Sequence, residues 1–419
     1  MTIYSFGIRL YFLLIYFASP FNSKAKKWIE GRRGWRKHLS GIDFSRQKWV
    51  WFHCSSYGEF QDGRSLMEAF KEKYPGTKIV LTFFSSTGYE LMKNYAGADM
   101  VMYLPPDTVT NCNFFLNRIK PVAAFFIRHD IWPGYVNACV ANHVPAFLVS
   151  FTLGKQSSFL QWPLQGFYRK VFYKYKCIFV HYEKDKHLLE EHHFSNNIIV
   201  AGNTRIDRII QMYQRYIGDN NPVVQTFKAN SFCVIAGSTH TKDREFFLQL
   251  ARTFPARNIK WIIVPHEIDQ NEINIAVNDW GEEMVLYSNP VNSNTARLLW
   301  VDKVGMLAGL YKYANVAFIG GGFDKAGIHS ILEPLVYGCP VCFGPNTRQY
   351  KEAADVLTAG NAQIISDAKE LQAFIEKYAG NPTLLSETYN SNKAYIQQHA
   401  GATIKIMDCL HKQLSPLLQ

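Results

Sequence analysis

Short apolar runs rich in β-branched and aromatic residues alternate with longer segments of helical periodicity, and this alternation occurs twice along the 419-residue chain. Continuous apolar runs of four to six residues are typical of strands that are buried on both faces of a parallel sheet. In the first half these runs are residues 49–53, 78–81, 122–126, 146–149 and 177–180. The stretches between them, such as 61–74 and 132–142, have apolar residues at helical spacing. The first half is therefore predicted to be a Rossmann-like α/β domain.

The second half repeats the same pattern after a polar stretch that ends in Asn220-Asn221-Pro222, which places a domain boundary between about residues 205 and 230. Its apolar runs are residues 232–236, 260–264, 297–301 and 316–320. We therefore expect two doubly wound α/β domains, residues 38–210 and 226–395, that face each other across a cleft. Residues 396–419 are expected to form a helix that packs back toward the first domain.

The composition indicates what kind of partner the protein binds and the redox state of its compartment. A net charge of +11 favours anionic partners such as phospholipid, lipopolysaccharide precursors, nucleotides or nucleic acid, without choosing among them. The eight cysteines lack the dense spacing of a disulfide scaffold, which favours a reducing compartment. The Cys339/Cys342 pair is predicted to consist of buried core thiols, because it falls on an apolar run and no second pair stands at zinc spacing.

The N-terminal region, residues 1–37, combines an apolar segment at 4–21 with a basic run that follows it. The basic residues are Lys24, Lys26, Lys27, Arg32, Arg33, Arg36 and Lys37. A helix lying in the lipid headgroup region, with the cations held by anionic lipid on the cytoplasmic leaflet, fits this order better than a signal peptide. A buried first helix and a short single span are the alternatives.

In open parallel sheets ligands bind at the carboxyl ends of the strands, so the residues that follow each run are the candidates for chemistry. After the first strand, Glu59 is expected to open a helix, where it can accept a proton from an attacking hydroxyl; an ordinary helix cap is the alternative. The loop at 82–88, with Ser86 and Thr87, could present donors to an anion or cap its helix.

The second half carries a denser set of such candidates. Gly237-Ser238-Thr239-His240 resembles an anion-cradling turn, and Pro265-His266 could place an imidazole on a phosphate or base edge, although a structural histidine is the commoner case. Gly320-Gly321-Gly322 and the segment 327–334 are expected to lead into a helix whose N–H groups point at a phosphate, with Glu333 on ribose hydroxyls. Metal signatures such as Asp-x-Asp are absent from the sequence, and His192-His193 lacks zinc spacing.

Six motifs together resemble the 3-deoxy-D-manno-octulosonic acid (Kdo) transferase family over residues 5–400. They are Ser55-Ser56-Tyr57-Gly58-Glu59, Tyr103-Leu104-Pro105-Pro106-Asp107, Ile131-Trp132-Pro133, Gly202-Asn203-Thr204-Arg205-Ile206-Asp207, Gly237-Ser238-Thr239-His240 and His329-Ser330-Ile331-Leu332-Glu333-Pro334. The resemblance implies a GT-B fold, CMP-Kdo as donor, a lipid A precursor as acceptor, inversion without a metal or other cofactor, and a place on the cytoplasmic face of the bacterial inner membrane.

Carried onto this chain, the resemblance makes Glu59 the general base. It implies donor contacts from Gly237, Ser238, Thr239, His240, Pro265, His266, Gly305, Met306, Gly327, His329, Ser330 and Glu333. It implies acceptor or cleft positions at Ser55, Ser56, Gly58, Ser86, Thr87 and Arg128.

The chain departs from the family pattern at several of these places. Arg128-His129-Asp130 stands where many relatives have Glu-Thr-Glu, Thr152 replaces a common arginine, Ser330 replaces an asparagine, and the segment 302–307 lacks a frequent glutamate. Two alternatives on the same scaffold are a nucleotide-sugar 2-epimerase and an inactive membrane adaptor. Nucleic-acid binding is not expected, because no recognised module occurs and the basic residues lie beside the apolar segment.

Overall fold

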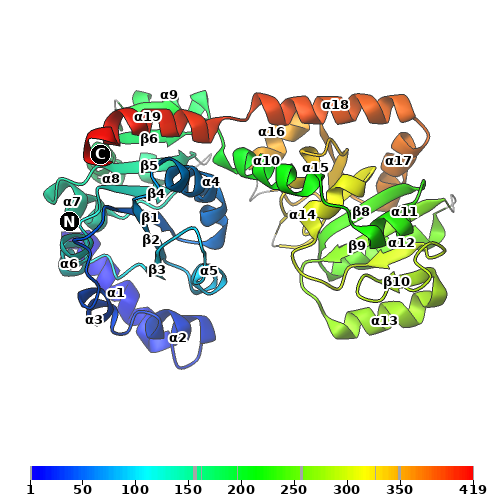
Figure 1. Ribbon diagram of the computed structural model, residues 1–419, viewed down its shortest axis with the longest axis horizontal. Helices are drawn as coiled ribbons and strands as arrows, with labels where there is room; N and C mark the ends of the chain where they lie inside the picture. Colours follow the sequence, from blue (N-terminus) through cyan, green and yellow to red (C-terminus); the bar gives the residue numbers. More distant parts are fainter. Residues whose placement is uncertain are drawn as a thin grey trace. The chain divides into compact units, whose positions relative to one another are not determined.

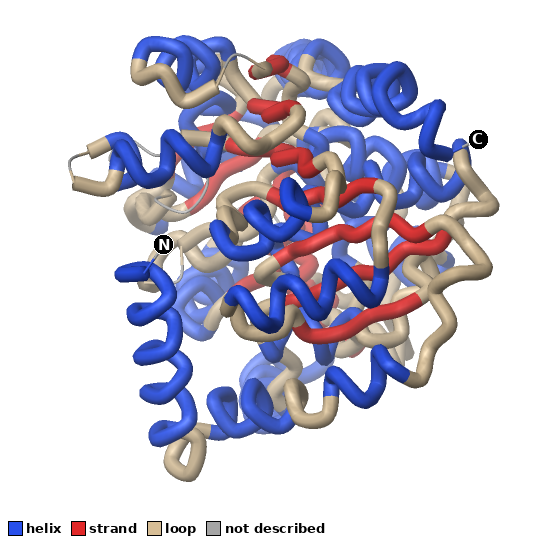
Figure 2. The backbone as a smooth tube through the Cα atoms, turned by 90° about the vertical axis from the view of Figure 1, so that its left-hand side faces the viewer, coloured by secondary structure: helices blue, strands red, loops and turns tan. Residues whose placement is uncertain are grey.

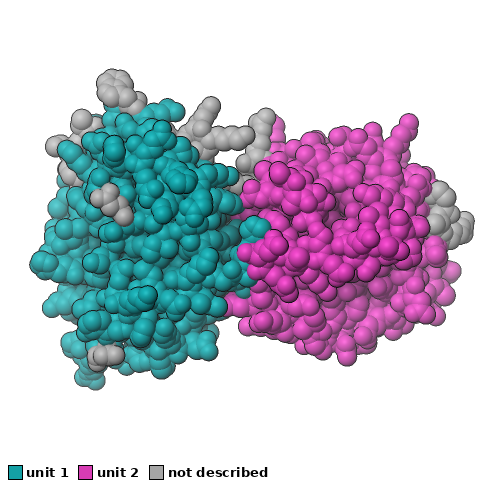
Figure 3. All heavy atoms as spheres, turned by 90° about the horizontal axis from the view of Figure 1, so that it is seen from above, with its two compact units in different colours: residues 1–208, 399–419 teal, residues 209–398 magenta. Residues whose placement is uncertain are grey.

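The computed structural model describes residues 2–153, 158–161, 163–195, 197–254, 258–325, 327–347 and 351–418. The chain divides into two compact units (Figure 3). The first comprises residues 1–208 and 399–419, and the second comprises residues 209–398. The first unit is thus built from two separate stretches of sequence, and the second unit is inserted between them.

The first unit is built on a seven-stranded parallel sheet in the order β3-β2-β1-β4-β5-β6-β7. The strands are β1 (Trp49–Cys54), β2 (Lys78–Phe83), β3 (Met100–Tyr103), β4 (Ala123–Ile127), β5 (Ala146–Phe151), β6 (Cys177–Val180) and β7 (Ile198–Val200). Alternate residues of a strand enter different cores: Trp51 belongs to one core, while Val50 and Phe52 belong to the other. The sheet is therefore buried on both faces, as the continuous apolar runs predict.

Helices cover both faces of this sheet (Figure 2). They are α1 (Thr2–Ala18), α2 (Ser23–Glu30), α3 (Trp35–Ser40), α4 (Tyr57–Lys73), α5 (Ser86–Met92), α6 (Val109–Ile119), α7 (Pro133–Ala141), α8 (Gln165–Phe172), α9 (Glu183–Glu191) and, from the end of the chain, α19 (Ala402–Leu418). Ile406 and Leu410 of α19 are buried in the same core as Val50 and Phe52. The Thr403 hydroxyl donates to Ser65 Oγ of α4 at 3.0 Å, which fixes α19 beside that helix.

The second unit has a seven-stranded parallel sheet of its own, in the order β10-β11-β9-β8-β12-β13-β14. Its strands are β8 (Phe232–Thr239), β9 (Ile259–Pro265), β10 (Met284–Leu286), β11 (Leu298–Trp300), β12 (Val316–Ile319), β13 (Val341–Phe343) and β14 (Ala362–Ile364). Its helices, shown with the strands in Figure 1, are α11 (Pro222–Lys228), α12 (Thr241–Thr253), α13 (Gln270–Trp280), α14 (Leu307–Leu310), α15 (Leu332–Leu335), α16 (Lys351–Thr358), α17 (Ala368–Ala379) and α18 (Pro382–Gln398). The boundary between the units falls within α10 (Thr204–Ile217). The predicted fold class, two parallel α/β domains, is confirmed.

The cysteines lie where the sequence predicts them. Cys339 and Cys342 are both buried and unpaired, and the Cys339 thiol donates to the Tyr311 carbonyl. Burial raises the pKa of Cys339 to about 12, so this thiol is protonated at neutral pH. The C-x-x-C pair is therefore part of the core of the second unit.

Helix α1 packs one face on the first unit and exposes the other. On the packed face, Phe12 stacks on Trp28 with ring centroids 5.1 Å apart, and the Tyr4 hydroxyl donates to Asp107 Oδ2 at 2.5 Å. The exposed apolar residues of α1 are Phe6, Leu10, Tyr11, Leu13, Leu14, Tyr16 and Phe17, each between 45% and 69% exposed. No helix in the described part of the chain is both long and apolar enough to cross a membrane.

One member of the basic run is not available to lipid. The Arg32 side chain is buried and donates from Nε to the Leu104 carbonyl at 2.8 Å and from Nη2 to the Phe84 carbonyl at 2.9 Å. It also lies over the Trp28 ring, 3.7 Å from the centroid. Arg32 is therefore not among the cations that can meet anionic lipid, because its guanidinium donates to backbone carbonyls inside the first unit.

Candidate active site

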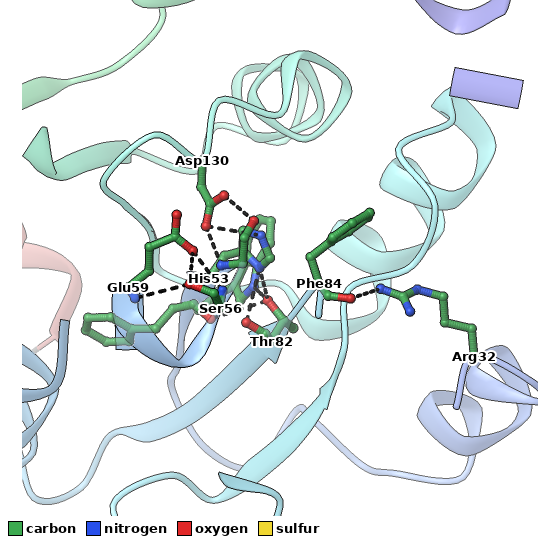
Figure 4. Close-up of polar contacts among 10 residues, drawn as sticks. Arg32, His53, Ser56, Glu59, Thr82, Phe84 and Asp130 are labelled. Carbon is green, nitrogen blue, oxygen red and sulfur yellow. Dashed lines mark hydrogen bonds and ion pairs between the residues drawn. The ribbon is translucent and has the colours of Figure 1, made fainter. Parts of the chain in front are cut away.

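The loop between β1 and α4 carries Glu59 on a capping box. Ser56 is the N-cap: its Oγ accepts a hydrogen bond from Glu59 N at 3.4 Å, and Ser56 N donates to Glu59 Oε2 at 2.7 Å. The Ser56 hydroxyl also donates to Oε2, at 3.0 Å (Figure 4). This reciprocal arrangement satisfies two free N–H groups at the start of α4 and holds the carboxylate in one orientation.

The capping role occupies one carboxylate oxygen of Glu59. Among the described residues, no hydrogen-bond donor reaches the other oxygen, Oε1, which points away from the cap in Figure 4. Burial raises the pKa of Glu59, and Asp62 adds to the rise, whereas the hydrogen bonds from Ser56 and the positive charge of Arg128 oppose it. Glu59 is therefore both a helix cap and a carboxylate with a higher proton affinity than usual. The capping role and the role of proton acceptor are compatible.

A second, buried carboxylate lies next to the cap. Asp130 Oδ2 accepts a hydrogen bond from Ser55 N at 2.5 Å, and its Oδ1 accepts one from the Ser55 hydroxyl. Burial raises the pKa of Asp130 well above its ordinary value, and the negative charge of Glu59 contributes to the rise. His53 Nε2 is 3.6 Å from Asp130 Oδ2, but burial lowers the pKa of His53 to about 3, so this imidazole is neutral.

Arg128 follows β4 and forms an ion pair with a buried aspartate of α4. Its Nε is 2.6 Å from Asp62 Oδ2, and Arg205 Nε lies 3.8 Å from the other oxygen of the same carboxylate. A buried carboxylate needs such partners because an uncompensated charge is costly to bury. Arg128 thus balances charge beside Glu59.

Ser86 and Thr87 lie at the start of α5, one strand away from Glu59. Ser85 caps this helix, with its Oγ accepting from Gly88 N at 3.0 Å, and Ser85 N donates to the Ser55 carbonyl at 2.8 Å. Ser86 is buried and Thr87 is exposed. The first unit therefore brings the predicted acceptor residues Ser55, Ser56, Gly58, Ser86, Thr87 and Arg128 to one edge of its sheet, where β1, β2 and β4 end.

In the second unit the end of β8 is strained, and the turn that leads from it into α12 is tightly held. Ser238, the last residue but one of β8, has φ of +51°, a conformation that costs a residue with a side chain about 1–3 kcal/mol. Asp243 Oδ2 accepts hydrogen bonds from His240 N at 2.9 Å and from Gly321 N at 2.7 Å. The turn after β8 and the glycine loop after β12 are thus tied together by one buried carboxylate.

Three imidazoles meet beside this turn. His240 Nε2 and His329 Nε2 are 2.9 Å apart, and the His266 ring centroid lies 4.4 Å from that of His329. Burial lowers the pKa of His329 to about 4 and also lowers that of His266, and the neighbouring histidines add to both effects. These two rings are therefore neutral at pH 7.

The glycine loop after β12 packs backbone against backbone. A Cβ on Gly320 would lie 2.3 Å from the Ser238 carbonyl oxygen, and one on Gly322 would lie 2.5 Å from Gly344 N. Only glycine fits at these two positions. The lack of a side chain lets the loop after β12 approach the ends of β8 and β13 closely.

The helix expected to begin near Gly327 begins at Leu332 and spans only Leu332–Leu335. Gly327 has φ of +81°, and residues 327–330 are not helical. The helix therefore begins later than predicted, and the non-helical loop before it brings His329 to the other imidazoles. Ser330 Oγ is buried without a hydrogen-bond partner among the described residues, and Glu333 lies in the first turn of α15.

Five of the predicted donor residues line two separate hollows of the second unit. Thr239, His240 and His266 line one of them, together with Asp324. Gly305 and Met306 line another, with Tyr216 and Tyr313. The structure thus does not bring Gly305 and Met306 into the hollow that the imidazoles line.

Sequence reasoning gave no role to four acidic residues of these sites: Asp62, Asp130, Asp243 and Asp324. Asp243 is the third residue of α12, where a carboxylate after a strand-ending turn signals a capping box. Asp62 and Asp324 have no such local signal, because their partners, Arg128 for one and His240 for the other, come from distant parts of the sequence.

Comparison with known sequences gives a consistent picture. A family model described as 3-deoxy-D-manno-octulosonic-acid transferase (kdotransferase) matches residues 29–208, all of which lie in the first unit. The 3-deoxy-D-manno-octulosonic acid transferase of Haemophilus influenzae is 21% identical over 375 residues, covering 87% of this chain and 87% of that protein. The protein of the same name from Rickettsia bellii is 22% identical over 420 residues, covering 98% of this chain and 95% of that protein.

A bifunctional glycosyltransferase/methyltransferase of Fusobacterium nucleatum is 26% identical over 330 residues, which cover 74% of this chain. The matched region spans about half of that relative, 49% of its length. Among solved structures, the UDP-GlcNAc 2-epimerase of Neisseria meningitidis superposes with a TM-score of 0.59 at 17% identity, covering 87% of this chain and 100% of that one. The glycotransferase of kitacinnamycin has a TM-score of 0.52 at 14% identity, covering 88% of this chain and 99% of that one. At these identities the structural likeness shows the fold, that of GT-B enzymes, and nothing of the substrate.

Proposed function

We infer that this chain, which belongs to the Kdo transferase family, is the glycosyltransferase that moves Kdo from CMP-Kdo to a lipid A precursor in lipopolysaccharide synthesis. The observation that carries the proposal is the Glu59 carboxylate, fixed by its capping box, with one free oxygen and a raised pKa. The relatives named above supply the identity of the transferred sugar.

In the proposed step, Glu59 Oε1 accepts the proton of an acceptor hydroxyl as the hydroxyl oxygen bonds to the anomeric carbon of Kdo. The bond between that carbon and the CMP phosphate oxygen breaks, and CMP leaves with the electron pair. Attack opposite to the leaving group inverts the anomeric centre. The step as written needs no metal, because a carboxylate takes the proton.

Recognition of the donor is assigned to the second unit. The turn after β8 and the loops after β9 and β12 hold the imidazoles of His240, His266 and His329 at one sheet edge, where ring N–H groups can donate to a phosphate. Such preorganised donors stabilise the charge that develops on a leaving phosphate. The hydroxyls of the ribose are assigned to Glu333.

The direct test is incubation of the purified chain with CMP-Kdo and a tetraacylated lipid A precursor in detergent. We expect a product heavier by Kdo and an equivalent release of CMP. A parallel incubation with UDP-GlcNAc tests for 2-epimerase chemistry and is expected to give no change. Absence of Kdo transfer, under conditions in which a known transferase is active, contradicts the proposal.

We also propose that α1 holds the enzyme on the cytoplasmic face of the inner membrane. The support is the row of exposed aromatic and aliphatic side chains on α1, which gain free energy by entering the headgroup region. Replacing Leu14 and Phe17 together by glutamate is expected to lower the partition onto anionic vesicles by about tenfold or more. Ile404→Glu, at a 68% exposed position on α19, is the matched control and is expected to leave partition unchanged. Equal binding of both variants would assign membrane association to another surface.

A further inference from the structure

The second unit contains three histidines in its sequence, His240, His266 and His329, and the fold brings all three together. Each follows a different strand: His240 follows β8, His266 follows β9, and His329 lies in the loop after β12. These strands are neighbours in the order β9-β8-β12 and run parallel, so their carboxyl ends share one edge. Side chains that are 26 and 63 residues apart along the chain therefore meet because of the topology.

Backbone contacts fix the three positions. His266 N donates to the Thr239 carbonyl at 3.0 Å, and His329 N donates to the Gly320 carbonyl at 3.2 Å. His240 N is held by Asp243 Oδ2 at 2.9 Å. The imidazoles thus project from a rigid base, which is what a preorganised site requires.

The imidazole nitrogens are close enough to share one ligand. One nitrogen of each ring lies within 4.8 Å of one nitrogen of the other two, and the Nε2 atoms of His240 and His329 are 2.9 Å apart. Nitrogens that bind one tetrahedral zinc ion lie about 3.3 Å from one another, given Zn–N bonds of about 2.0 Å. The three rings are stacked, with interplanar angles of 7° to 27°, so the imidazoles must turn about their side-chain bonds before their nitrogens converge on one ion.

A carboxylate lies near the second nitrogen of His240, just beyond hydrogen-bond distance. Asp324 Oδ2 lies 3.7 Å from His240 Nδ1, the nitrogen on the side of the ring away from His329. A carboxylate on the second nitrogen orients the ring and raises the basicity of the nitrogen that binds the metal.

We propose that His240, His266 and His329 form a three-nitrogen site that binds Zn²⁺ or a similar divalent transition metal in the nucleotide-free chain. Imidazole is a borderline ligand that prefers such ions to Mg²⁺ or Ca²⁺. Three protein ligands leave a fourth tetrahedral position for water or another oxygen ligand. The proposal uses side chains assigned above to donor recognition, but it does not depend on the transfer of Kdo.

Metal binding to the purified full-length chain, carrying no polyhistidine tag and stripped with a chelator, tests the site without donor or acceptor. Equilibrium dialysis against Zn²⁺ with elemental analysis is expected to give about one ion per chain that excess Mg²⁺ does not displace. Co²⁺ in place of Zn²⁺ is expected to give the intense visible absorption bands of tetrahedral cobalt. A chain that binds no Zn²⁺, or Co²⁺ spectra of an octahedral ion, would overturn the proposal, and neither measurement requires a variant.

Three variants then locate the ion: His240→Asn, His266→Asn and His329→Asn are each expected to weaken Zn²⁺ binding at least about tenfold. His187→Asn, at an exposed position on α9 of the first unit, is the matched control and is expected to bind as the wild type does. Unchanged affinity in all three variants would place the ion elsewhere and contradict the assignment. Kdo transfer, measured separately, can fail or succeed without changing this result.

Discussion

The two units place their polar residues at the same edge of the same kind of sheet, yet the chemistry at the two edges differs. In the first unit the edge holds carboxylates: Glu59 and Asp130 have raised pKa values, and Asp62 is paired with Arg128. In the second unit it holds imidazoles and glycine backbone, with Ser238 in a strained conformation. One edge is suited to accept a proton, and the other is suited to hold an anion or a metal.

This difference shows that a parallel α/β sheet fixes where a site lies but not what the site does. The strands and their order decide which loops meet, and the residues in those loops decide the chemistry. A division of labour follows: changes at the first edge should affect turnover, and changes at the second should affect the binding of CMP.

The largest expected effect comes from Glu59→Gln. The amide keeps the shape of the side chain but cannot accept a proton, so we expect kcat to fall by about 10²–10⁴-fold. Isothermal titration with CMP should give a Kd within about twofold of the wild type, since the nucleotide is assigned to the other unit. Glu72→Gln, exposed on the same helix, is the control. Full turnover in Glu59→Gln would show that another residue is the general base. A large loss of CMP affinity would show that the two units do not divide turnover from CMP binding.

An intermediate effect is expected from Gly322→Ala. The added Cβ would lie 2.5 Å from Gly344 N, so the loops after β12 and β13 must separate. Overpacking of this kind costs about 1–3 kcal/mol, and we expect a lower Tm and roughly tenfold weaker binding of CMP. Gly218→Ala, where a Cβ meets open space, serves as the control. Wild-type CMP affinity in Gly322→Ala would show that the glycine loop does not take part in CMP binding.

The smallest effect on turnover is expected from Arg128→Met, and it is a shift of the pH profile rather than a loss of rate. The positive charge of Arg128 lowers the pKa of Glu59, so its removal raises that pKa further. A base with a higher pKa becomes protonated at a higher pH, so the acid limb of the kcat/KM profile should move to higher pH. The plateau at alkaline pH should stay within about threefold of the wild type.

Arg205→Met is the control for this shift, because it also removes a guanidinium near Asp62, at 3.8 Å. We expect its acid limb to stay nearer to that of the wild type. Identical profiles for Arg128→Met and the wild type would show that Arg128 does not influence the base.

The strands that sequence patterns predicted and those they missed differ in one respect. The missed strands are the four outermost strands of the two sheets: β3, β7, β10 and β14. Their burial is incomplete: β14, at Ala362–Ile364, has no fully buried residue. Edge strands are short and half exposed, so they lack the continuous apolar run that identifies central strands.

The candidate site was predictable where function depends on local sequence and not where it depends on distant partners. Glu59 follows a predicted strand and stands three residues after a capping serine, so its position could be read directly. The pairing of Asp62 with Arg128 could not, because it joins α4 to the end of β4. The glycines at 320–322 correctly indicated a close-packed loop after a strand. The course of the chain after Gly327 depends on a positive φ that composition does not fix.

Helix α19 places the final piece of the first unit after the whole of the second unit in the sequence. During synthesis on the ribosome, the core that contains Val50 and Phe52 waits for Ile406 and Leu410, while residues 209–398 are already free to fold. The unit that is translated first is thus the last to mature, and a premature stop near residue 400 would damage the earliest-made half of the protein.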